Sequence, residues 1–361
     1  MIIAASGDQK ALLEEEFPFL TFVDLPGYGI KYGKNRALTL LKIVSGIPKI
    51  LIRVKQERAW LRRFIAREHP DAVISDNRYG LSAKGLFSVF ITHQLGIQTP
   101  FGNIGNQLLQ RMNYRYIRRF SICWVPDLEK EHSLAGELSY PGKLPEIPVR
   151  YIGLLSRFTK EGGKDPDNAA PAPPHIADLL ILLSGPEPQR TLFERTIIGE
   201  LPSYPGTVLL VRGRPGKKGG RRYTIAEWSG ELGQDSIPGL PEILGMSDRL
   251  KIYDHLPAKA LNTVVCGAEW VIARSGYSSI MDLLKLGKKT LLVPTPGQME
   301  QEYLGAWLSR QQLAASFSQE GFSLTAALKF AKNFPYQEIG PLDKGQLGEV
   351  IKELMAEIAG F

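Results

Sequence analysis

The stretch "VIARSGYSSIMDLLKLGKKTLLVPTPGQMEQEYL", residues 271–304, places an apolar run, a short polar turn, a helical pattern and a second apolar run in succession. The first run ends at Ala273 and predicts a buried strand, and the turn "RSG" leads directly into the helical pattern. The second run, "KKTLLVPTP", predicts another strand, which is followed by a loop rich in Gln and Glu. A strand, a helix and a strand in this order predict one unit of a parallel α/β sheet.

Apolar runs of the same kind occur on both sides of this stretch, among them "MIIAAS", "DAVISD", "FSVFITH", "ADLLILLSG" and "TVLLVRG". Between the two groups, "TKEGGKDPDNAAPAPP" lacks large apolar side chains and predicts a linker. At 361 residues, the chain exceeds the length at which one hydrophobic core usually stops growing. We therefore expect an α/β domain at 1–152, a linker at 153–176, a second α/β domain at 177–335 and a terminal helix within 336–361.

The charge of the chain is concentrated in its first half. A net charge of +7 favours an acidic partner, and the segment 36–69, "RALTLLKIVSGIPKILIRVKQERAWLRRFIAREH", is dense in Lys and Arg. Gly46 and Pro48 predict that it breaks into two helices. Either these are surface helices with solvated charges, or their Trp60-containing basic face rests on anionic lipid. Neither zinc-finger spacing nor an aromatic RNP-like strand indicates a nucleic-acid partner.

The cysteines and the ends of the sequence bear on location. Cys123 and Cys266 fall in apolar, strand-like runs, which predicts two buried structural thiols in a reducing compartment. No signal segment opens the sequence, and no apolar run reaches the roughly 18–20 residues that span a bilayer. We expect a cytoplasmic protein, with a peripheral position on the inner face of the membrane as a further possibility.

The turn after the first strand of the opening stretch is the strongest candidate site. Ligands of doubly wound sheets bind beyond the carboxyl ends of the strands, and Arg274, Ser275 and Gly276 lie at such an end. Free backbone N–H groups and the positive end of the next helix favour phosphate, and Arg274 adds charge. The alternative is an ordinary capped helix with Arg274 in solvent. The loop "SGPEPQRT", 184–191, occupies the equivalent position after the first strand of the second half.

Polar side chains near this turn fit a sugar. Asp282 lies two turns into the helix, where its carboxylate either accepts hydrogen bonds from a ribose or faces solvent. Gln298, Gln301 and Glu302 crowd the loop after "VPTP". Amides and carboxylates supply the directional hydrogen bonds that the hydroxyl groups of a hexose require. Together with the phosphate-favouring turn, they predict a bound sugar nucleotide.

The stretch "ARSGYSSIMDLLKLGKKTLLVPTPGQMEQEYL" resembles the C-terminal, family 28-type half of MurG-like glycosyltransferases. The likeness is strongest over 179–308, while "SDNRYG" and "ITHQLG" in the first half resemble acceptor-side loops. The resemblance implies a GT-B fold, in which two Rossmann-like domains with parallel sheets face each other across a cleft. It also implies an inverting, metal-independent enzyme that moves a hexose or N-acetylhexosamine from a UDP-sugar to an envelope or lipid-linked acceptor, without a cofactor.

The resemblance also implies roles for individual residues. On the nucleotide-sugar side, it assigns the diphosphate to Ser184 and Gly185, and the nucleobase to the segment around His255 and Leu256. Ser275 and Gly276 resemble the phosphate loop of the family, Asp282 its ribose-binding acid, and Gln301 and Glu302 the pair that contacts the donor sugar. Arg274 and Gln298 complete the set of candidate nucleotide-sugar residues. On the acceptor side, His93 resembles a His of the family, and His93 and Asp76 are the candidates for a general base. Glu302 stands where the family has an amide, which bears on the choice of sugar.

Other features of the sequence leave alternatives open. Family members begin with a strand and a glycine-rich loop ending in His, whereas this sequence begins at what resembles the second strand, so we expect UDP binding with poor sugar transfer. The only Asp-x-Asp, Asp165 to Asp167, lies in the linker, and "RPGKKGGRR", 214–222, reads as an exposed basic loop. A sugar-nucleotide epimerase or hydrolase of the same fold, and a non-catalytic UDP-sugar-binding partner subunit, are the competing functions.

Overall fold

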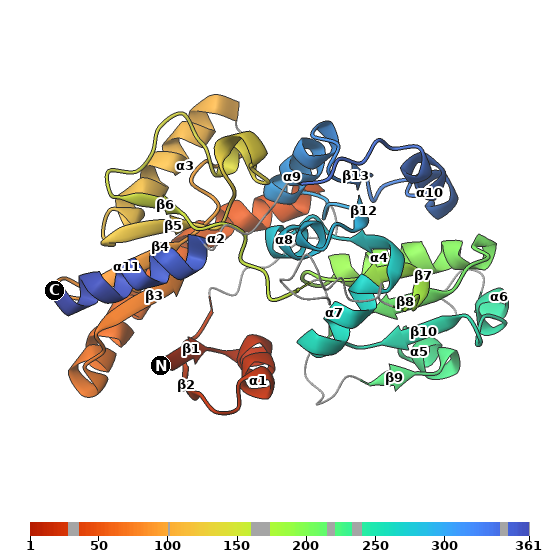
Figure 1. Cartoon of the computed structure of the whole chain (residues 1–361), viewed down its shortest axis with the longest axis horizontal. Helices are drawn as coiled ribbons and strands as arrows, with labels where there is room; N and C mark the ends of the chain where they lie inside the picture. The colour runs from red at the N-terminus through yellow and green to blue at the C-terminus, as the bar shows by residue number, and fades with distance from the viewer. Residues whose placement is uncertain are drawn as a thin grey trace, which may run out of the picture. The chain divides into compact units, whose positions relative to one another are not determined.

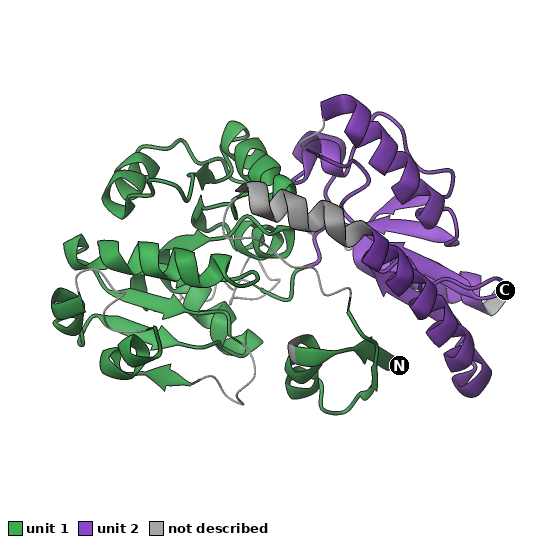
Figure 2. Cartoon of the chain, turned by 180° about the vertical axis from the view of Figure 1, so that it is seen from behind, with its two compact units in different colours: residues 1–42, 156–338 green, residues 43–155, 339–361 purple. Residues whose placement is uncertain are grey.

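The structure is a computed structural model that describes residues 1–27, 36–99, 102–159, 174–214, 221–232, 240–339 and 346–360. The chain divides into two compact units (Figure 2). Unit 1 comprises residues 1–42 and 156–338, and unit 2 comprises residues 43–155 and 339–361. Most of the predicted linker, residues 160–173, lies outside the described residues.

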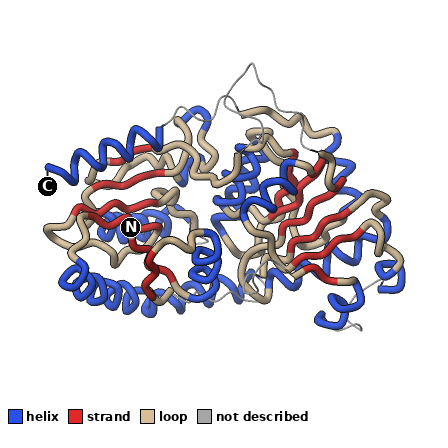
Figure 3. The backbone as a smooth tube through the Cα atoms, turned by 60° about the horizontal axis from the view of Figure 1, so that its bottom comes forward, coloured by secondary structure: helices blue, strands red, loops and turns tan. Residues whose placement is uncertain are grey.

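Unit 1 is built on a seven-stranded sheet with the order β13-β12-β11-β7-β8-β10-β9 (Figures 1 and 3). Its strands are β7 Ala177–Leu182, β8 Val208–Val211, β9 Arg222–Tyr223, β10 Leu250–Tyr253, β11 Ala268–Ala273, β12 Lys289–Leu292 and β13 Ala315–Ser316. Neighbouring strands are parallel, except that β9 runs antiparallel to β10. The apolar runs of the second half therefore form the parallel α/β sheet that the sequence predicts.

Helices cover both faces of this sheet because successive strand residues point to opposite sides. The helices are α4 Gln189–Glu200, α5 Ile225–Leu232, α6 Leu240–Leu244, α7 Ala258–Cys266, α8 Tyr277–Lys285, α9 Met299–Arg310 and α10 Leu324–Lys332, with a 3-10 turn at Leu201–Ser203. Leu179 and Ile181 of β7 pack with α4, α5 and α10, whereas Leu180 packs with α7 and α8. Burial on both faces explains why β7 reads as a continuous apolar run.

Unit 2 contains a smaller parallel sheet with the order β3-β4-β5-β6. Its elements are β3 Ala72–Asp76, β4 Phe87–Ile91, β5 Ile122–Val125, β6 Val149–Tyr151, α3 Gly102–Ile117, α11 Gln346–Gly360 and 3-10 turns at Lys130–His132 and Gly136–Leu138. Val350 and Leu354 of α11 pack with Phe87 and Trp124 of the sheet. The apolar face of the terminal helix therefore completes the core of unit 2.

The first residues of the chain form a separate small sheet. β1 Ile2–Ala5 and β2 Thr21–Asp24 pair in parallel through four residue pairs, and α1 Gly7–Glu16 connects them. The sequence predicts these strands within one domain at 1–152. In the described part of the chain, β1 and β2 pair only with each other, and residues 1–42 group with 156–338.

The basic segment of the first half forms one helix, α2 Arg36–Glu68, with Pro48 inside it. The predicted break at Gly46 and Pro48 is therefore wrong. A proline within a helix costs about 3 kcal/mol through its missing N–H and its ring clash. Burial of Val54, Leu61 and Phe64 along one side of α2 offsets that penalty, because apolar packing stabilises a long helix more than propensity does. None of the described helices is both long and apolar enough to cross a membrane.

The two cysteines differ in their surroundings. Cys123 is buried in β5, and this burial raises the pKa of its thiol to about 12. Cys266 is the last residue of α7 and is only partly buried, so the prediction that it lies buried in a strand is wrong. Gly267 separates α7 from β11. This boundary could not be predicted, because the apolar run in the sequence continues across it.

Candidate functional site

The turn after β11 opens onto the first turn of α8. Ser275 is buried, and its hydroxyl donates to the backbone oxygen of Gln301 at 2.8 Å, which ties the turn to the start of α9. Gly276 caps α8 without a side-chain hydrogen bond. A Cβ built on Gly276 would meet, within the described residues, only Nε2 of Gln301 at 4.0 Å. Gly276 therefore leaves room for a ligand beside the first turn of α8, where the helix dipole favours an anion.

The loop after β7 lies at the same edge of the sheet. Ser184 is partly exposed, and the exposed Gly185 has a φ of +93°, a left-handed conformation that favours glycine. The neighbouring loop after β8 comes very close, since a Cβ on Gly213 would lie 2.1 Å from the backbone oxygen of Leu183. The ends of β7, β8 and β11 therefore meet along one edge, as the sequence predicts for a ligand site.

Arg274 lies beneath this edge and is 1% exposed, so the alternative that places it in solvent is wrong. Its guanidinium donates to four oxygens from other segments: the backbone oxygens of Val293 (3.0 Å), Pro294 (3.2 Å) and Gln189 (3.0 Å), and Oε1 of Gln319 (2.7 Å). Burial lowers its pKa to about 9, which leaves it charged at neutral pH. Among the described residues no carboxylate pairs with it. Arg274 therefore braces three loops and adds an uncompensated positive charge below them.

Gln301 and Glu302, which the sequence predicts to bind the donor sugar, are hydrogen-bonded to the loop before α9. Gln301 is 7% exposed, and its Oε1 accepts from the backbone N–H of Thr295 at 2.9 Å. Oε1 of Glu302 accepts from the backbone N–H of Gly297 at 2.9 Å. Gln298 is the N-cap residue of α9. The Nε2 group of Gln301 lies toward Gly276, so an amide donor borders the open turn of α8.

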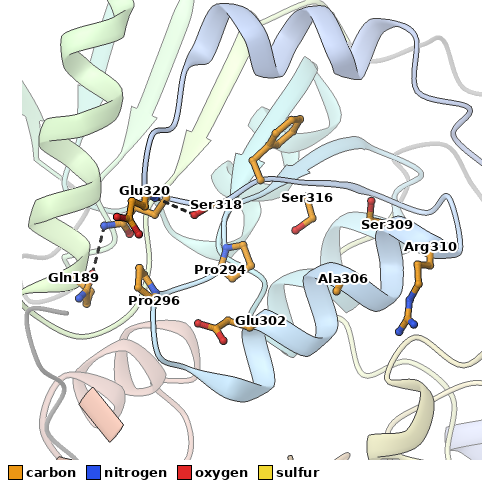
Figure 4. Close-up of a pocket in the computed structure, with 12 residues that line it drawn as sticks. Gln189, Pro294, Pro296, Glu302, Ala306, Ser309, Arg310, Ser316, Ser318 and Glu320 are labelled. Carbon is orange, nitrogen blue, oxygen red and sulfur yellow. Dashed lines mark hydrogen bonds between the residues drawn. The ribbon is translucent and has the colours of Figure 1, made fainter. Parts of the chain in front are cut away.

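A cavity of about 790 Å³ lies beside this loop, between α9 and the segment after β13 (Figure 4). Its lining mixes polar and apolar groups and comprises Gln189, Pro294, Pro296, Glu302, Ala306, Ser309, Arg310, Ser316, Phe317, Ser318, Gln319 and Glu320. Gln319 and Gln189 link it to the brace formed by Arg274. Its volume and its hydroxyl, amide and carboxylate groups fit a polyhydroxylated ligand.

The remaining nucleotide-side candidates are Asp282, His255 and Leu256. The hydroxyl of Ser156 donates to Asp282, and burial raises the pKa of that carboxyl against the opposing effect of the hydrogen bond. A ribose would have to share this carboxylate with Ser156. His255 is 6% exposed, and neither of its ring nitrogens has a hydrogen bond among the described residues, although Nε2 lies 4.0 Å from Oε2 of Glu15. A buried imidazole without hydrogen bonds is costly unless a ligand supplies them. Leu256 is partly buried against the core formed by α7 and α8.

In unit 2, the two candidates for a general base lie at adjacent strand ends. Asp76 ends β3 and His93 follows β4, its parallel neighbour. The Asp76 residue is exposed, yet desolvation by the surrounding protein raises the pKa of its carboxyl, and the nearby His93 opposes that rise. Asn77, with a φ of +53°, accepts at its Oδ1 a hydrogen bond from Thr92 at 3.5 Å. The structure thus brings the acceptor-side pair together, and Glu57 of α2 anchors the loop through Arg78 at 2.7 Å.

One group of positioning residues escaped the sequence interpretation. Nε of Arg212 donates to the buried carboxylate of Glu194 at 2.6 Å, and its Nη1 lies 3.4 Å from Oδ1 of Asp254. This network fixes the ends of β8 and β10 and thereby the approach to His255. The sequence contained a signal for it, because Arg212, Asp254 and Arg274 each follow an apolar strand directly.

Two sequence features fall outside the site. Asp165 and Asp167 lie outside the described residues, as does most of the basic loop 214–222. In the described part of the chain, no group of three or more His, Cys, Asp or Glu side chains is placed to hold a metal ion.

Residues 252–328, which contain β11, α8 and the Gln301 loop, match the family model described as the glycosyltransferase family 28 C-terminal domain. This part of the chain is similar to a family 28 glycosyltransferase domain. No curated protein matches the chain significantly. The prediction of a family 28-type C-terminal half is therefore confirmed.

Solved structures resemble the whole chain at low identity. Arabidopsis thaliana UGT89C1, complexed with UDP-L-rhamnose, is 10% identical, with 99% of this chain and 91% of that chain covered and a TM-score of 0.59. UDP-GlcNAc 2-epimerase from Methanocaldococcus jannaschii is 12% identical over 99% and 91%, with a TM-score of 0.51. MurG of Acinetobacter baumannii is 11% identical over 100% and 90%, with a TM-score of 0.49. The first two likenesses show the fold, which is that of the GT-B glycosyltransferases.

Proposed function

We propose that this protein transfers a hexose or N-acetylhexosamine from a UDP-sugar to a lipid-linked or envelope acceptor. The observation that carries this proposal is the open first turn of α8 at Gly276, within the segment that matches the family 28 domain. An unobstructed helix N-terminus above the buried charge of Arg274 suits a diphosphate. The neighbouring cavity, with Glu302 among its polar groups, suits the sugar.

The proposed reaction is a single inverting displacement. The hydroxyl oxygen of the acceptor attacks the anomeric carbon of the donor, while the bond from that carbon to the diphosphate oxygen breaks. A base accepts the proton of the acceptor hydroxyl, and we assign this role to His93 together with Asp76. The N–H groups of α8 stabilise the charge that develops on the leaving UDP, a contribution often worth several kcal/mol. The reaction needs no cofactor in this scheme, and we place the protein in the cytoplasm, peripheral to the membrane.

Replacing Gly276 by Val is expected to abolish measurable UDP binding, because a branched side chain would occupy the space through which the phosphates approach. The fold should tolerate it, since a Cβ there makes ordinary contact at 4.0 Å. Gly230→Val in α5 is the matched control, because nothing in the described residues lies within 4 Å of a Cβ at that site. Calorimetric titration with UDP measures the effect. Unchanged affinity in a folded Gly276→Val protein would place the phosphates elsewhere.

His255 tests the nucleobase side of the same proposal. Its two ring nitrogens are buried without a hydrogen bond among the described residues, and one of them can pair with an N–H or a carbonyl group on the edge of a uracil. We expect His255→Leu to weaken UDP binding about tenfold, as loss of about one net hydrogen bond implies. Competition by inorganic pyrophosphate should not change, because pyrophosphate lacks the base. Equal weakening for UDP and pyrophosphate would show that His255 acts on the phosphates.

An epimerase or hydrolase is the second candidate, because a UDP-GlcNAc 2-epimerase is among the structures that share this fold. Such an enzyme would change or cleave a UDP-sugar without an acceptor. Incubating the protein with UDP-sugars, with and without a lipid extract, separates these functions. Acceptor-dependent release of UDP supports transfer, acceptor-independent conversion supports the alternative, and binding without turnover supports a partner subunit.

A further inference from the structure

Helix α3 of unit 2 carries an apolar ridge that the fold does not cover. Ile104, Leu108 and Met112 recur at every fourth residue, and they are 84%, 66% and 36% exposed. Leu144, in the loop beside α3, is 43% exposed. We call these four side chains the α3 ridge. Residues four apart share one helix face, so the ridge is continuous.

A basic cavity of about 550 Å³ lies along the same helix. Its lining includes four cationic side chains, Arg111, Arg115, Arg118 and Lys143, and a single carboxylate, Glu146. Glu146 pairs with Arg118 at 3.1 Å, whereas no carboxylate of the described residues pairs with Arg111 or Arg115. The helix itself contains neither Asp nor Glu. Leu144 belongs to both features, so the ridge and the cavity adjoin.

The loop that completes this surface is fixed to α3. The backbone oxygen of Lys143 accepts a hydrogen bond from Tyr114, and Tyr114 accepts one from Nε2 of Gln110 at 2.8 Å. On its inner side, α3 is tied to the loop that follows His93, because Nδ2 of Asn113 donates to the backbone oxygen of Gln94 at 3.0 Å. A membrane or protein surface that binds α3 would therefore contact a helix that is hydrogen-bonded to Gln94, the residue next to the proposed base His93.

Helix α2, where the sequence placed the lipid-facing charge, has a different surface. Its apolar side chains Val54, Leu61 and Phe64 are buried, and Trp60 stacks on Phe64 at 5.0 Å. In its described part, the exposed side is charged, with Ile52 as its large exposed apolar residue. Attachment to a bilayer interface requires apolar burial together with charge, and α3 offers both.

We propose that the α3 ridge and its basic cavity form the surface by which this protein docks on an anionic bilayer. The ridge enters the boundary between headgroups and acyl chains, and Arg111 and Arg115 pair with lipid phosphates. The charge complementarity and the absence of acidic residues on α3 favour this occupant over a second protein. The inference deepens the proposed function on its acceptor side, because it places the His93 loop at the surface that holds a lipid acceptor.

Sedimentation with vesicles of phosphatidylglycerol and phosphatidylcholine in equal parts tests the proposal without any nucleotide sugar. The Arg111→Gln, Arg115→Gln double variant is expected to bind about 30-fold more weakly at low salt, from the usual contribution of each arginine near an anionic surface. The Ile104→Ser, Leu108→Ser variant should lose at least about tenfold through reduced apolar burial. Both pairs are exposed, so the fold should persist.

The matched control is Arg62→Gln, Arg63→Gln on α2, which removes the same charge from exposed positions. It should change vesicle binding by less than about threefold, because the described part of α2 exposes Ile52 as its large apolar side chain and has no ridge that would hold its charges at the bilayer boundary. Equal losses from α2 and α3, or equal binding to pure phosphatidylcholine, would overturn the proposal. UDP titration of the same proteins keeps the inferences separate, since failed UDP binding with intact docking counts against the proposed donor alone.

Discussion

Replacing Asp76 by Asn is expected to lower sugar transfer by about 10²- to 10⁴-fold, the usual contribution of a positioned acid or base, and to leave UDP affinity unchanged. The carboxyl of Asp76 has a raised pKa because of desolvation, and it lies close enough to His93 for the two charges to interact. The nucleotide-side residues all belong to unit 1, whereas Asp76 belongs to unit 2. The variant should therefore separate turnover from binding.

The effect of this substitution on stability should have the opposite sign. A carboxyl with a raised pKa in the folded state favours its neutral form, so its contribution is lost as pH rises through that pKa. Asp76→Asn should therefore keep or increase the melting temperature at neutral pH, and this gain should vanish below the ordinary pKa range of Asp. The wild-type rate should fall as acid protonates the base.

His93→Gln provides the control for the proposed pair. If Asp76 orients His93, the two single variants and the double variant should lose similar amounts of activity, because residues that act as a unit are not additive. Full activity in Asp76→Asn with a retained acid limb would assign the base to His93 alone. Full activity in both single variants would remove the pair from the reaction.

Much of the fold of unit 1 could be predicted because both faces of its strands are buried. Such strands read as continuous apolar runs, and the turn that ends each run marks the carboxyl edge of the sheet. Ser184, Gly276 and Gln301 could be placed at that edge from their positions relative to β7, β11 and α9 alone. Apolar periodicity and turn chemistry are local, so a single sequence displays them.

Features that depend on distant packing could not be predicted. The course of α2 through Pro48 depends on the burial of Val54 and Leu61, and the sequence does not show what covers them. Ile104 and Leu108 are exposed, although their spacing in the sequence is typical of the buried face of an ordinary helix. The bracing role of Arg274 could not be predicted for the same reason, because its four oxygen partners come from other segments, among them Gln189, which is far away in the sequence.

Replacing Arg274 by Met is expected to lower the melting temperature by an amount on the order of 10 °C, and to weaken UDP binding as a consequence. Four oxygens now paired with the guanidinium would lose their donor, and a buried acceptor without a partner costs about 1–3 kcal/mol. The stacking of the guanidinium over the ring of Phe193, at 4.3 Å, would also be lost. The loops that hold Gln189 and Pro294 would then no longer share a brace.

Arg274→Lys distinguishes bracing from simple charge. An ammonium group retains the positive charge, but it cannot reach oxygens on both sides of the site as the planar guanidinium does. If bracing is the role of Arg274, Lys should leave the protein destabilised and UDP binding weak, whereas Arg222→Met on the exposed strand β9 should change neither. Recovery of UDP affinity by Lys with an unchanged melting temperature would instead make Arg274 a direct phosphate-binding cation. Calorimetry and UDP titration of the same three proteins decide between these roles. Loss of bracing lowers both the melting temperature and the UDP affinity, whereas loss of charge alone lowers only the UDP affinity.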